Sequence, residues 1–392
     1  MTHLPRILTV LDYYLPGFKG GGPIRTLANM MEWLGTEYEF YIVTRDRDLG
    51  DKEPYPGIQR DRWMSQGKAD RPMWIRYLAP EELRSRALKR ILNSLEYDLL
   101  YLNSFFSILS VKIMWLLYLG RIGSKPLVLA PRGEFFPSAL AVRKYKKQLY
   151  LLAARTMNVY RRACLWQAST PDEAAAIARM FPAYSKKVHT ALDFMAKELP
   201  ADLGRQPLPD GCLRLVSLAR ICPNKNLHFV LNILGQLDLE GQYDIYGPVE
   251  DEAYWERCQE IIRRLPPNIR VSYGSVLSPD EVFSTLARYH LFFLPTTGEN
   301  FGHAIWEALS AGCLLLISDR TPWRNLQALE VGWDVSLDDA PRFKALIERV
   351  AGMDAAEFER RSRYAQTYAR AIAGNETTLR ATRQLFLKAL GS

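Results

Sequence analysis

Short apolar runs alternate with amphipathic helical segments along the chain, and this alternation constrains the fold more than any other feature. A loop and a helical pattern follow most of the apolar runs. Short buried strands that alternate with helices form parallel βαβ units. We therefore predict strands at residues 6–11, 39–44, 97–102 and 126–130, and again at residues 213–219, 243–247, 269–274, 290–295 and 313–318.

The strand pattern stops and restarts near residues 202–211, a stretch with two prolines and two glycines. A chain of 392 residues is also too long for one ordinary core. We predict an α/β protein of two doubly wound domains, residues 1–200 and 201–375, that face each other across a cleft. Ligands in such sheets bind beyond the carboxyl ends of the strands, so functional residues should lie in loops that follow strands.

The chain is basic, with a net charge of +8 and a pI of about 9.1. A basic protein can bind nucleic acid, an anionic membrane or a phosphorylated substrate. Nucleic-acid binding remains an alternative, but the sequence has no helix-turn-helix, zinc-finger or RNP signature. The five cysteines are scattered, without a C-x-x-C pair, which argues against a zinc site or disulfide framework and fits a reducing compartment. They are Cys164, Cys212, Cys222, Cys258 and Cys313.

Neither a secretory signal nor a membrane span is predicted. The first ten residues lack the long apolar stretch of a signal peptide. The most apolar helical window, residues 108–119, contains Lys112 and is too short to cross a bilayer. We expect a cytoplasmic protein, either soluble or peripheral on the inner face of the plasma membrane.

Three loops that follow predicted strands carry candidate chemistry. The first has Glu299 and Glu307 in Gly-Glu-Asn-Phe-Gly-His-Ala-Ile-Trp-Glu, residues 298–307, at the start of a helix. The unpaired N–H groups of a helix N-terminus suit diphosphate or hydroxyl oxygens, and two carboxylates can hold hydroxyl groups at separate points. We place Glu307 two turns into this helix. A helix cap and a surface glutamate are the alternative interpretation.

The second loop contains Arg220 and Lys225, two cations suited to phosphate oxygens, although solvated surface cations are an equal alternative. The third loop, residues 17–23, contains three consecutive glycines that let the backbone approach a ligand closely. It is not the G-x-G-x-x-G dinucleotide fingerprint, and the chain has no P-loop motif.

Together the three loops resemble the retaining glycosyltransferases of family 4, whose GT-B fold consists of two Rossmann-like domains. The resemblance covers nearly the whole chain, and its most specific part is the E-x7-E element in G-E-N-F-G-H-A-I-W-E-A-L-S-A-G. It implies an acceptor-side domain at residues 1–200 and a nucleotide-sugar-binding domain at residues 201–375. A C-terminal helix at residues 376–392 would pack back on the N-terminal domain.

The resemblance also implies roles for individual residues. Glu299, Arg220 and Lys225 are the predicted catalytic residues: the two cations would neutralise the leaving diphosphate, and Glu299 would contact the donor sugar. Glu307 would hold the ribose. The other predicted donor contacts are Gly21, Gly22, Asn300, Phe301, Gly302, His303 and, in the loop near the base, Val276. A structural role for His303 is an equal alternative.

The implied reaction retains the configuration of the anomeric carbon and needs no metal or cofactor, since the nucleotide sugar is a substrate. The leaving phosphate would deprotonate the acceptor hydroxyl. Many relatives carry a histidine after an N-terminal strand, whereas residues 101–106 here contain none, and Asn103 or Ser104 would supply a hydrogen bond instead. The alternatives are hydrolysis by paired carboxylates and a GT-B phosphorylase or epimerase.

Two N-terminal segments are candidates for the acceptor side. Arg132 and Glu134 follow a strand and would contact acceptor or diphosphate, with a buried ion pair as the equal alternative. The stretch 143–162 carries seven cations and no acid, with apolar residues between them. Such a helix suits an anionic membrane surface, although an ordinary solvated face is the alternative. We expect a glycan or polyprenyl-linked acceptor and a role in bacterial surface polysaccharide assembly: exopolysaccharide, capsule or the O-antigen of lipopolysaccharide.

Overall fold

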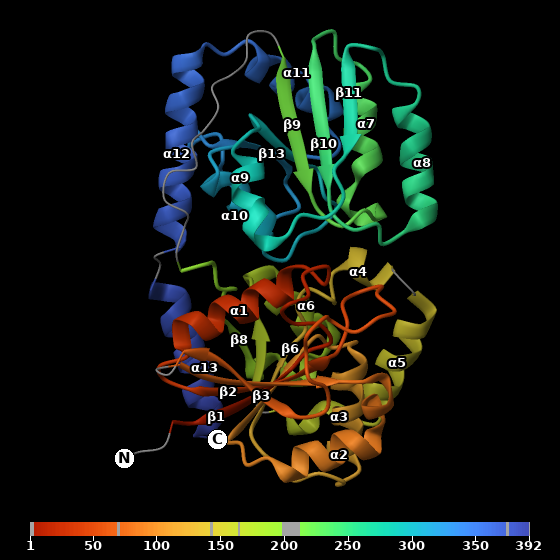
Figure 1. Cartoon of the computed structure of the whole chain (residues 1–392), viewed down its shortest axis with the longest axis vertical. Coiled ribbons are helices and arrows are strands. Elements are labelled where there is room, and N and C mark those ends of the chain that lie inside the picture. Colours follow the sequence, from red (N-terminus) through yellow and green to blue (C-terminus); the bar gives the residue numbers. More distant parts are fainter. Residues whose placement is uncertain are drawn as a thin grey trace. The chain divides into compact units, whose positions relative to one another are not determined.

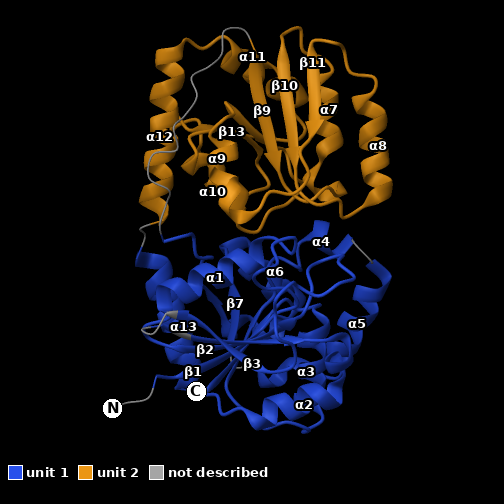
Figure 2. Cartoon of the chain, viewed as in Figure 1, with its two compact units in different colours: residues 1–197, 375–392 blue, residues 198–374 orange. Residues whose placement is uncertain are grey.

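The computed structural model describes residues 4–68, 71–141, 144–163, 165–197, 212–373 and 376–391 (Figure 1). The chain forms two compact units (Figure 2). Unit 1 consists of Met1–Lys197 and Asn375–Ser392, and unit 2 consists of Glu198–Gly374. The predicted break at residues 202–211 lies outside the described residues, as do Cys164 and Arg143.

In its described residues, unit 1 contains an eight-stranded sheet in the order β3-β4-β2-β1-β5-β6-β7-β8. All neighbouring strands are parallel except β3 and β4. The strands are β1 (Arg6–Val10), β2 (Glu39–Arg45), β3 (Trp63–Lys68), β4 (Arg71–Leu78), β5 (Leu99–Asn103), β6 (Leu127–Ala130), β7 (Leu165–Ala168) and β8 (Val188–Thr190).

Helices cover both faces of this sheet, because alternate residues of each strand point to opposite faces. Thus Ile7 packs in a cluster with α1 and α13, whereas Leu8 packs in a cluster with α2 and α3. The helices of unit 1 are α1 (Gly22–Leu34), α2 (Ser85–Ser94), α3 (Ile108–Tyr118), α4 (Pro137–Ala141), α5 (Lys144–Thr156), α6 (Pro171–Met180) and α13 (Glu376–Leu390).

The last helix, α13, belongs to unit 1 although nearly 180 residues of unit 2 precede it. Phe386 lies edge-on to the rings of Tyr38 and Tyr101, each at 5.5 Å. Arg383 donates hydrogen bonds to both carboxylate oxygens of Glu37. The chain therefore leaves unit 1 once and returns to complete its core.

In its described residues, unit 2 contains a six-stranded, all-parallel sheet in the order β11-β10-β9-β12-β13-β14. The strands are β9 (Leu213–Leu218), β10 (Gly241–Tyr246), β11 (Ile269–Tyr273), β12 (Leu291–Leu294), β13 (Leu314–Ser318) and β14 (Gly332–Val335). The helices are α7 (Leu227–Leu234), α8 (Glu252–Ile262), α9 (Val282–Leu286), α10 (His303–Ser310), α11 (Ala340–Ala351) and α12 (Ala355–Ala373).

The strand order in unit 2 is the 3-2-1-4-5-6 order of doubly wound nucleotide-binding folds, and the predicted architecture is confirmed. Strands β4, β2, β1, β5, β6 and β7 of unit 1 follow the same order. The order reverses between β9 and β12 in unit 2, and between β1 and β5 in unit 1. Ligands of such sheets bind at this switch point, at the carboxyl ends of the strands.

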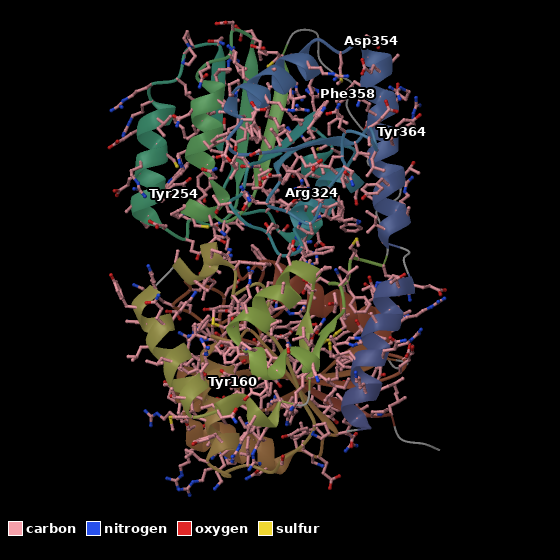
Figure 3. All side chains as sticks on the ribbon, turned by 180° about the vertical axis from the view of Figure 1, so that it is seen from behind. Tyr160, Tyr254, Arg324, Asp354, Phe358 and Tyr364 are labelled. Atoms are coloured by element: carbon pink, nitrogen blue, oxygen red, sulfur yellow. The ribbon has the colours of Figure 1, made fainter. Side chains whose placement is uncertain are left out.

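An aromatic cluster supports the loops at the carboxyl ends of β5 and β6. Phe105 stacks on Tyr160 at 4.5 Å and lies 4.8 Å from Phe135 (Figure 3 labels Tyr160). Trp166 and Phe181 extend the cluster, with ring centroids 5.1 Å apart. Because close-packed aromatic rings have few alternative arrangements, these loops rest on a rigid base.

The structure also contains strands that the sequence did not predict: β3, β4, β7, β8 and β14. The β3–β4 hairpin lies at a sheet edge and carries Gly67, Pro72 and Arg76, so it lacks a continuous apolar run. Strand β7 contains Gln167, which is buried because it bonds to Tyr101 and to the Ala191 carbonyl. None of the helices within the described ranges is long and apolar enough to cross a membrane.

Candidate functional site

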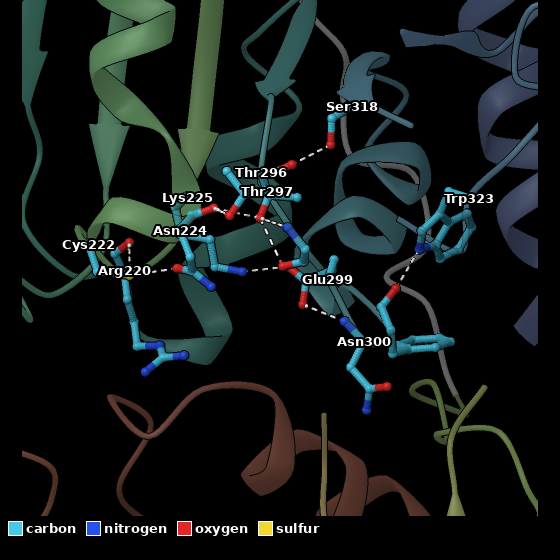
Figure 4. A network of polar contacts seen from close by, with 12 residues as sticks. Arg220, Cys222, Asn224, Lys225, Thr296, Thr297, Glu299, Asn300, Ser318 and Trp323 are labelled. Carbon is cyan, nitrogen blue, oxygen red and sulfur yellow. Dashed lines mark hydrogen bonds and ion pairs between the residues drawn. The ribbon is translucent and has the colours of Figure 1, made fainter. Parts of the chain in front are cut away.

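In unit 2 the loops after β9 and β12 are joined by hydrogen bonds at the switch point (Figure 4). The Asn224 carbonyl accepts from Thr297 N–H at 2.8 Å and from the Thr296 hydroxyl at 2.9 Å. The Asn226 side chain donates to the Pro295 carbonyl at 3.0 Å. Asn226 has a φ of 61°, a left-handed conformation that asparagine tolerates and that precedes helix α7. These bonds fix the positions of the two predicted loops relative to each other.

The junction brings two of the three predicted catalytic residues into contact. Lys225 Nζ lies 2.5 Å from Glu299 Oε2, and the side chains are only 14% and 17% exposed. The Glu299 N–H donates to the Arg320 carbonyl at 3.1 Å, which ties this loop to the segment after β13. The pair is therefore a positioned, partly desolvated charge pair.

The ionisation of Glu299 depends on this pair. Burial alone would raise the pKa of its carboxyl, but Lys225 lowers it by charge and by hydrogen bonding. The charge of Arg220 and the Asn300 N–H lower the pKa further, so that the net shift is downward from 4.5. Glu299 is thus a carboxylate at neutral pH, able to accept hydrogen bonds from hydroxyl groups but not to act as a general acid.

Arg220 is the more accessible cation of the predicted pair. Its guanidinium contacts Glu250 at 2.5 Å, and the two side chains are 38% and 34% exposed. A partly exposed ion pair contributes little to stability. A guanidinium held in this way can exchange its carboxylate partner for a phosphate at small cost.

The next residues of the loop combine a rigid backbone with one unsatisfied polar atom. Phe301 is buried, and its carbonyl accepts from Trp323 Nε1 at 2.6 Å. The rings of Phe301 and His303 lie 4.8 Å apart. Within the described structure, the buried oxygen Oδ1 of Asn300 has no hydrogen-bond partner. Buried polar atoms are normally paired, so this atom marks a place where a ligand donor group fits.

Helix α10 begins directly after Gly302, which has a φ of 83°. This left-handed conformation favours glycine, and a Cβ at this position would also approach the end of the Ile305 side chain to 2.8 Å. Among the residues that the structure describes, no side chain caps the helix start, and its positive dipole end suits an anion. Glu307 is buried and lies little more than one turn into α10, so its predicted position two turns in was wrong: the helix begins at His303.

The loop that contains Val276 is braced by a chain of side chains. Gly274 and Ser275 bond to the end of β10 through Ile245 and Gly247, and Val276 is half-buried. Tyr246 bonds to Tyr289 at 3.0 Å, and the Tyr289 hydroxyl donates to Asp244 at 2.6 Å. This bracing fixes the loop to the end of β10.

In unit 1 the glycine-rich loop follows β1, as predicted. Asp48 Oδ2 accepts from the backbone N–H groups of Phe18 at 2.7 Å and of Lys19 at 3.0 Å. Gly21 has a φ of 76°, and a Cβ there would meet nothing within 4 Å. Gly22 begins helix α1, whose start has no side-chain cap from the described part of the chain. Hydrogen bonds to Asp48 thus fix the loop at Phe18 and Lys19, and the space beside Gly21 is open.

The acceptor-side candidates Asn103 and Arg132 bond to each other. Arg132 donates to Asn103 Oδ1 from Nε at 3.1 Å and from Nη2 at 2.8 Å. It also forms an ion pair with Asp193 at 2.5 Å, with side-chain exposures of 3% and 7%. The buried ion pair considered from the sequence is therefore present, but its acid is Asp193 rather than Glu134.

Glu134, the third acceptor-side candidate, caps the backbone after β5. It accepts from the N–H groups of Phe105 at 2.5 Å and Phe106 at 2.9 Å, and from the Ser104 hydroxyl at 2.6 Å. Burial raises the pKa of its carboxyl, and these hydrogen bonds offset only part of that shift. The side chains of Ser104 and Asn103 thus both form hydrogen bonds within unit 1.

Comparison with known proteins finds a family model that matches unit 2. Residues 202–366, nearly all of unit 2, match the model of the family described as Glycosyl transferases group 1. The chain is a glycosyltransferase. A search of curated proteins finds no significant match to the sequence.

Solved structures confirm the predicted GT-B fold of this glycosyltransferase. HepE of Anabaena, in complex with UDP and glucose, has a TM-score of 0.68 and 14% identity, and the alignment covers 100% of both chains. Sucrose-phosphate synthase of Thermosynechococcus elongatus has a TM-score of 0.71, 16% identity and 99% coverage of each chain. The trehalose-6-phosphate synthase OtsA has a TM-score of 0.67 and 12% identity, covering 97% of this chain and 98% of its own.

Several residues that build the site were missed by the sequence analysis. Asn224 and Trp323 fix the loop after β12, Glu250 holds Arg220, and Asp48 and Asp193 hold the loops of unit 1. Only Asn224 carried a usable signal, since it lies between the two predicted cations. The others contact the site from 22 to 61 residues away, and no local pattern encodes such contacts.

Proposed function

We propose that this glycosyltransferase is a retaining, metal-independent enzyme of family 4 that takes its sugar from a nucleotide-diphosphate sugar. The observation that carries the proposal is the Lys225–Glu299 pair, with Arg220 also lowering the pKa of Glu299. Two cations and the open start of α10 offer positive charge to a diphosphate, and one carboxylate offers acceptors to a sugar. The buried, unpaired Oδ1 of Asn300 adds a site for a ligand donor group.

The proposed reaction breaks the bond between the anomeric carbon and the diphosphate oxygen. The bonding electrons leave with the diphosphate, whose added negative charge Arg220 and Lys225 stabilise as it develops. The acceptor hydroxyl oxygen forms the new bond on the same face, and the leaving phosphate oxygen takes its proton. Glu299 orients the sugar hydroxyls and does not donate a proton, because Lys225 keeps it ionised.

The structural neighbours support the donor class. HepE was solved with UDP and glucose and also with UDP-glucose. The braced loop at Val276 and the buried Glu307 are the proposed sites for base and ribose. On the N-terminal side, the open Gly21 and Gly22 are proposed to approach the diphosphate.

The proposed acceptor is a glycan or a polyprenyl-linked saccharide, and the proposed role is assembly of bacterial surface polysaccharide. The cation-rich helix α5, whose outward residues include Tyr145 and Leu149 at 85% and 70% exposure, supports work at an anionic membrane surface on the cytoplasmic side. Asn103, Arg132 and Glu134 are proposed to shape the acceptor side by holding its loops.

A thermal-shift screen against nucleotide sugars tests the donor class, since a ligand that binds only the folded state raises the melting temperature. We expect a shift with at least one nucleotide sugar and release of the matching nucleoside diphosphate, undiminished by a metal chelator. Glu299→Ala, Arg220→Ala and Lys225→Ala should each reduce turnover strongly, and Arg270→Ala, an exposed cation at the amino end of β11, should not. Full activity in all three site variants would overturn the proposal.

A further inference from the structure

Helix α5 carries apolar side chains on the face that points away from the core. Its buried residues are Leu151 and Ala154. The large side chains on the opposite face are Tyr145, Leu149 and Leu152, which are 85%, 70% and 61% exposed. Residues spaced by four and three lie on one face of a helix, so these three form a continuous stripe. Exposed apolar residues in a row mark a surface that contacts another apolar group.

The inner face of α5 is firmly attached, so the exposure of the stripe is not a sign of a loose helix. The hydroxyl groups of Tyr150 and Tyr160 lie 2.5 Å apart. Lys147 donates to the Ala139 carbonyl at 2.7 Å, and its ammonium lies 4.9 Å from the Phe106 ring centroid. These contacts fix α5 to helix α4 and to the aromatic cluster.

A groove of about 420 Å³ runs beside the stripe, between α4, α5 and the end of α6. Its apolar lining includes Pro137, Leu140, Leu151, Leu152 and Met180. This volume falls within the range of small-molecule sites, about 300–1,000 Å³. Leu152 belongs to both the groove and the stripe, so the two apolar surfaces are continuous.

The charged side chains that line the groove are all positive. Lys144, Lys147 and Arg155 line it, and the sequence from residue 137 to residue 162 contains no acidic residue. Lys147 is engaged with Ala139, whereas neither Lys144 nor Arg155 has an ion-pair partner among the described residues. An apolar groove with cations at its rim is complementary to an amphiphile with an anionic head.

The groove also starts at the ligand-binding edge of unit 1. Helix α4 follows the six-residue loop after β6, the loop that contains Arg132 and Glu134. Lys144 is the first residue of α5, close to α4 in the chain (Figure 1). Arg155 lies eleven residues further, about 16 Å along the helix axis. The end of the groove at Lys144 is therefore the end nearer to the carboxyl edge of the sheet.

We infer that this groove binds the hydrocarbon chain of a phosphate-bearing lipid, with the phosphate at Lys144 and the chain along Leu140, Leu152 and Met180. The inference rests on the proposed function and makes it more specific: the acceptor is lipid-linked, and its lipid is held by unit 1. A chain in the groove and a head at Lys144 place the group attached to the phosphate at the carboxyl edge. The aliphatic stem of Arg155 accommodates the far part of the chain.

Calorimetric titration of the full chain with dodecyl phosphate, below its aggregation concentration, tests the inference. Dodecyl phosphate should bind saturably, and inorganic phosphate at the same concentration should not. The measurement needs no nucleotide sugar. Failure to bind dodecyl phosphate, together with a thermal shift by a nucleotide sugar, would overturn the lipid site and leave the proposed donor chemistry standing. Binding of dodecyl phosphate, without a thermal shift by any nucleotide sugar, would support the lipid site and contradict the proposed donor chemistry.

Two matched pairs of variants locate the site. Lys144→Glu should weaken binding at least about fivefold, the effect of roughly one cation near an anionic lipid head, whereas Lys146→Glu on the same helix, outside the groove, should have a smaller effect. Leu152→Gln should weaken binding about threefold to tenfold, and Leu149→Gln, in the stripe but outside the groove, should change it by less than twofold. Equal losses within each pair would show that α5 attracts amphiphiles only as a charged apolar surface, and would overturn the groove.

Discussion

Two partly buried glutamates, Glu134 in unit 1 and Glu299 in unit 2, occupy similar places in similar sheets. Each lies in a loop at the carboxyl end of a parallel strand, β6 for Glu134 and β12 for Glu299. Backbone N–H groups and a hydroxyl surround Glu134, and burial raises its pKa. A lysine contacts Glu299, and the net shift of its pKa is downward. Glu134 therefore accepts hydrogen bonds from the backbone of its own unit, whereas Glu299 carries a negative charge at the site.

The difference extends to the neighbouring cations. Arg132 in unit 1 is 3% exposed and uses its guanidinium on four side chains of its own unit. Arg220 in unit 2 is 38% exposed and contacts one carboxylate, itself 34% exposed. The comparison teaches that polar residues at a strand end are structural where all their hydrogen-bonding groups are paired within the fold, and available for chemistry where they remain partly exposed or keep an unpaired atom. Each prediction below tests one part of it.

The largest effect on stability is expected in unit 1. Arg132→Met leaves Asp193 buried without its cation, and should lower the free energy of unfolding by about 3–5 kcal/mol. Urea denaturation measures this change. Lys186→Met removes an exposed cation of the same unit and should change stability by less than about 0.5 kcal/mol. Wild-type stability in Arg132→Met would show that the network is not structural.

The largest effect on activity is expected in unit 2. Lys225→Met removes a cation from the developing diphosphate charge, and should reduce turnover by about 10²–10³. The rate of nucleoside diphosphate release, measured far below the melting temperature, reports this loss. Arg270→Met is the control, because it removes an exposed cation at the far end of the sheet. Equal rates in the two variants would remove Lys225 from the chemistry.

The two glutamates should affect the pH dependence of stability in opposite directions. The lowered pKa of Glu299 stabilises the fold above the unfolded-state pKa near 4.5, and this contribution is lost as the pH falls through the folded value. The raised pKa of Glu134 favours the protonated form, so its contribution is present below the unfolded-state pKa and is lost as the pH rises through the folded value.

Substitution by glutamine separates these two contributions. Between pH 3 and 5, Glu299→Gln should lack part of the gain in stability that the wild type shows as the pH rises. From pH 4 upward, Glu134→Gln should gain stability relative to the wild type. Denaturation curves across this range measure both differences. Differences of the same sign would contradict the contrast between the two carboxyls.

A smaller effect is expected at the residue that fixes the Phe301 carbonyl. Trp323→Phe keeps an aromatic ring but removes one hydrogen bond, and should weaken donor binding by about threefold to tenfold. Trp333→Phe is the matched control in unit 2, because its buried indole N–H has no partner in the described structure. That variant should lose some packing stability and keep its donor affinity. Loss of affinity in both would mean that Trp323 acts only through packing.

The smallest effect is expected at Glu250. Glu250→Gln removes the carboxylate that competes with phosphate for Arg220, and should tighten nucleoside diphosphate binding by about threefold or less at low salt. The gain should shrink as salt is added, because exposed charges are screened. A calorimetric titration at two salt concentrations measures it. A weaker affinity in the variant would mean that Glu250 positions Arg220 instead of competing for it.

The sequence predicted the fold and the loops of the site because both depend on local patterns. Apolar runs located the central strands, and the residues after β9 and β12 stood out by their charge and glycine content. The edge hairpin β3–β4 was missed because partly exposed strands carry no apolar run. The contrast between Arg132 and Arg220 could not be predicted, since Asp193 and Glu250 are 61 and 30 residues away from them. Whether a side chain is buried, and whether its polar atoms are paired, depends on the tertiary structure and not on local sequence.

The central claim is that the loops after β9 and β12 hold the diphosphate of a nucleotide sugar. Calorimetric titration of the full chain with UDP, GDP, ADP and dTDP tests it most directly, with Lys225→Met and Arg220→Ala measured beside the wild type. We predict that at least one nucleoside diphosphate binds the wild type, and that each variant binds it about tenfold more weakly or worse while remaining folded. No binding by any of the four, or equal affinity in all three proteins, would contradict the claim.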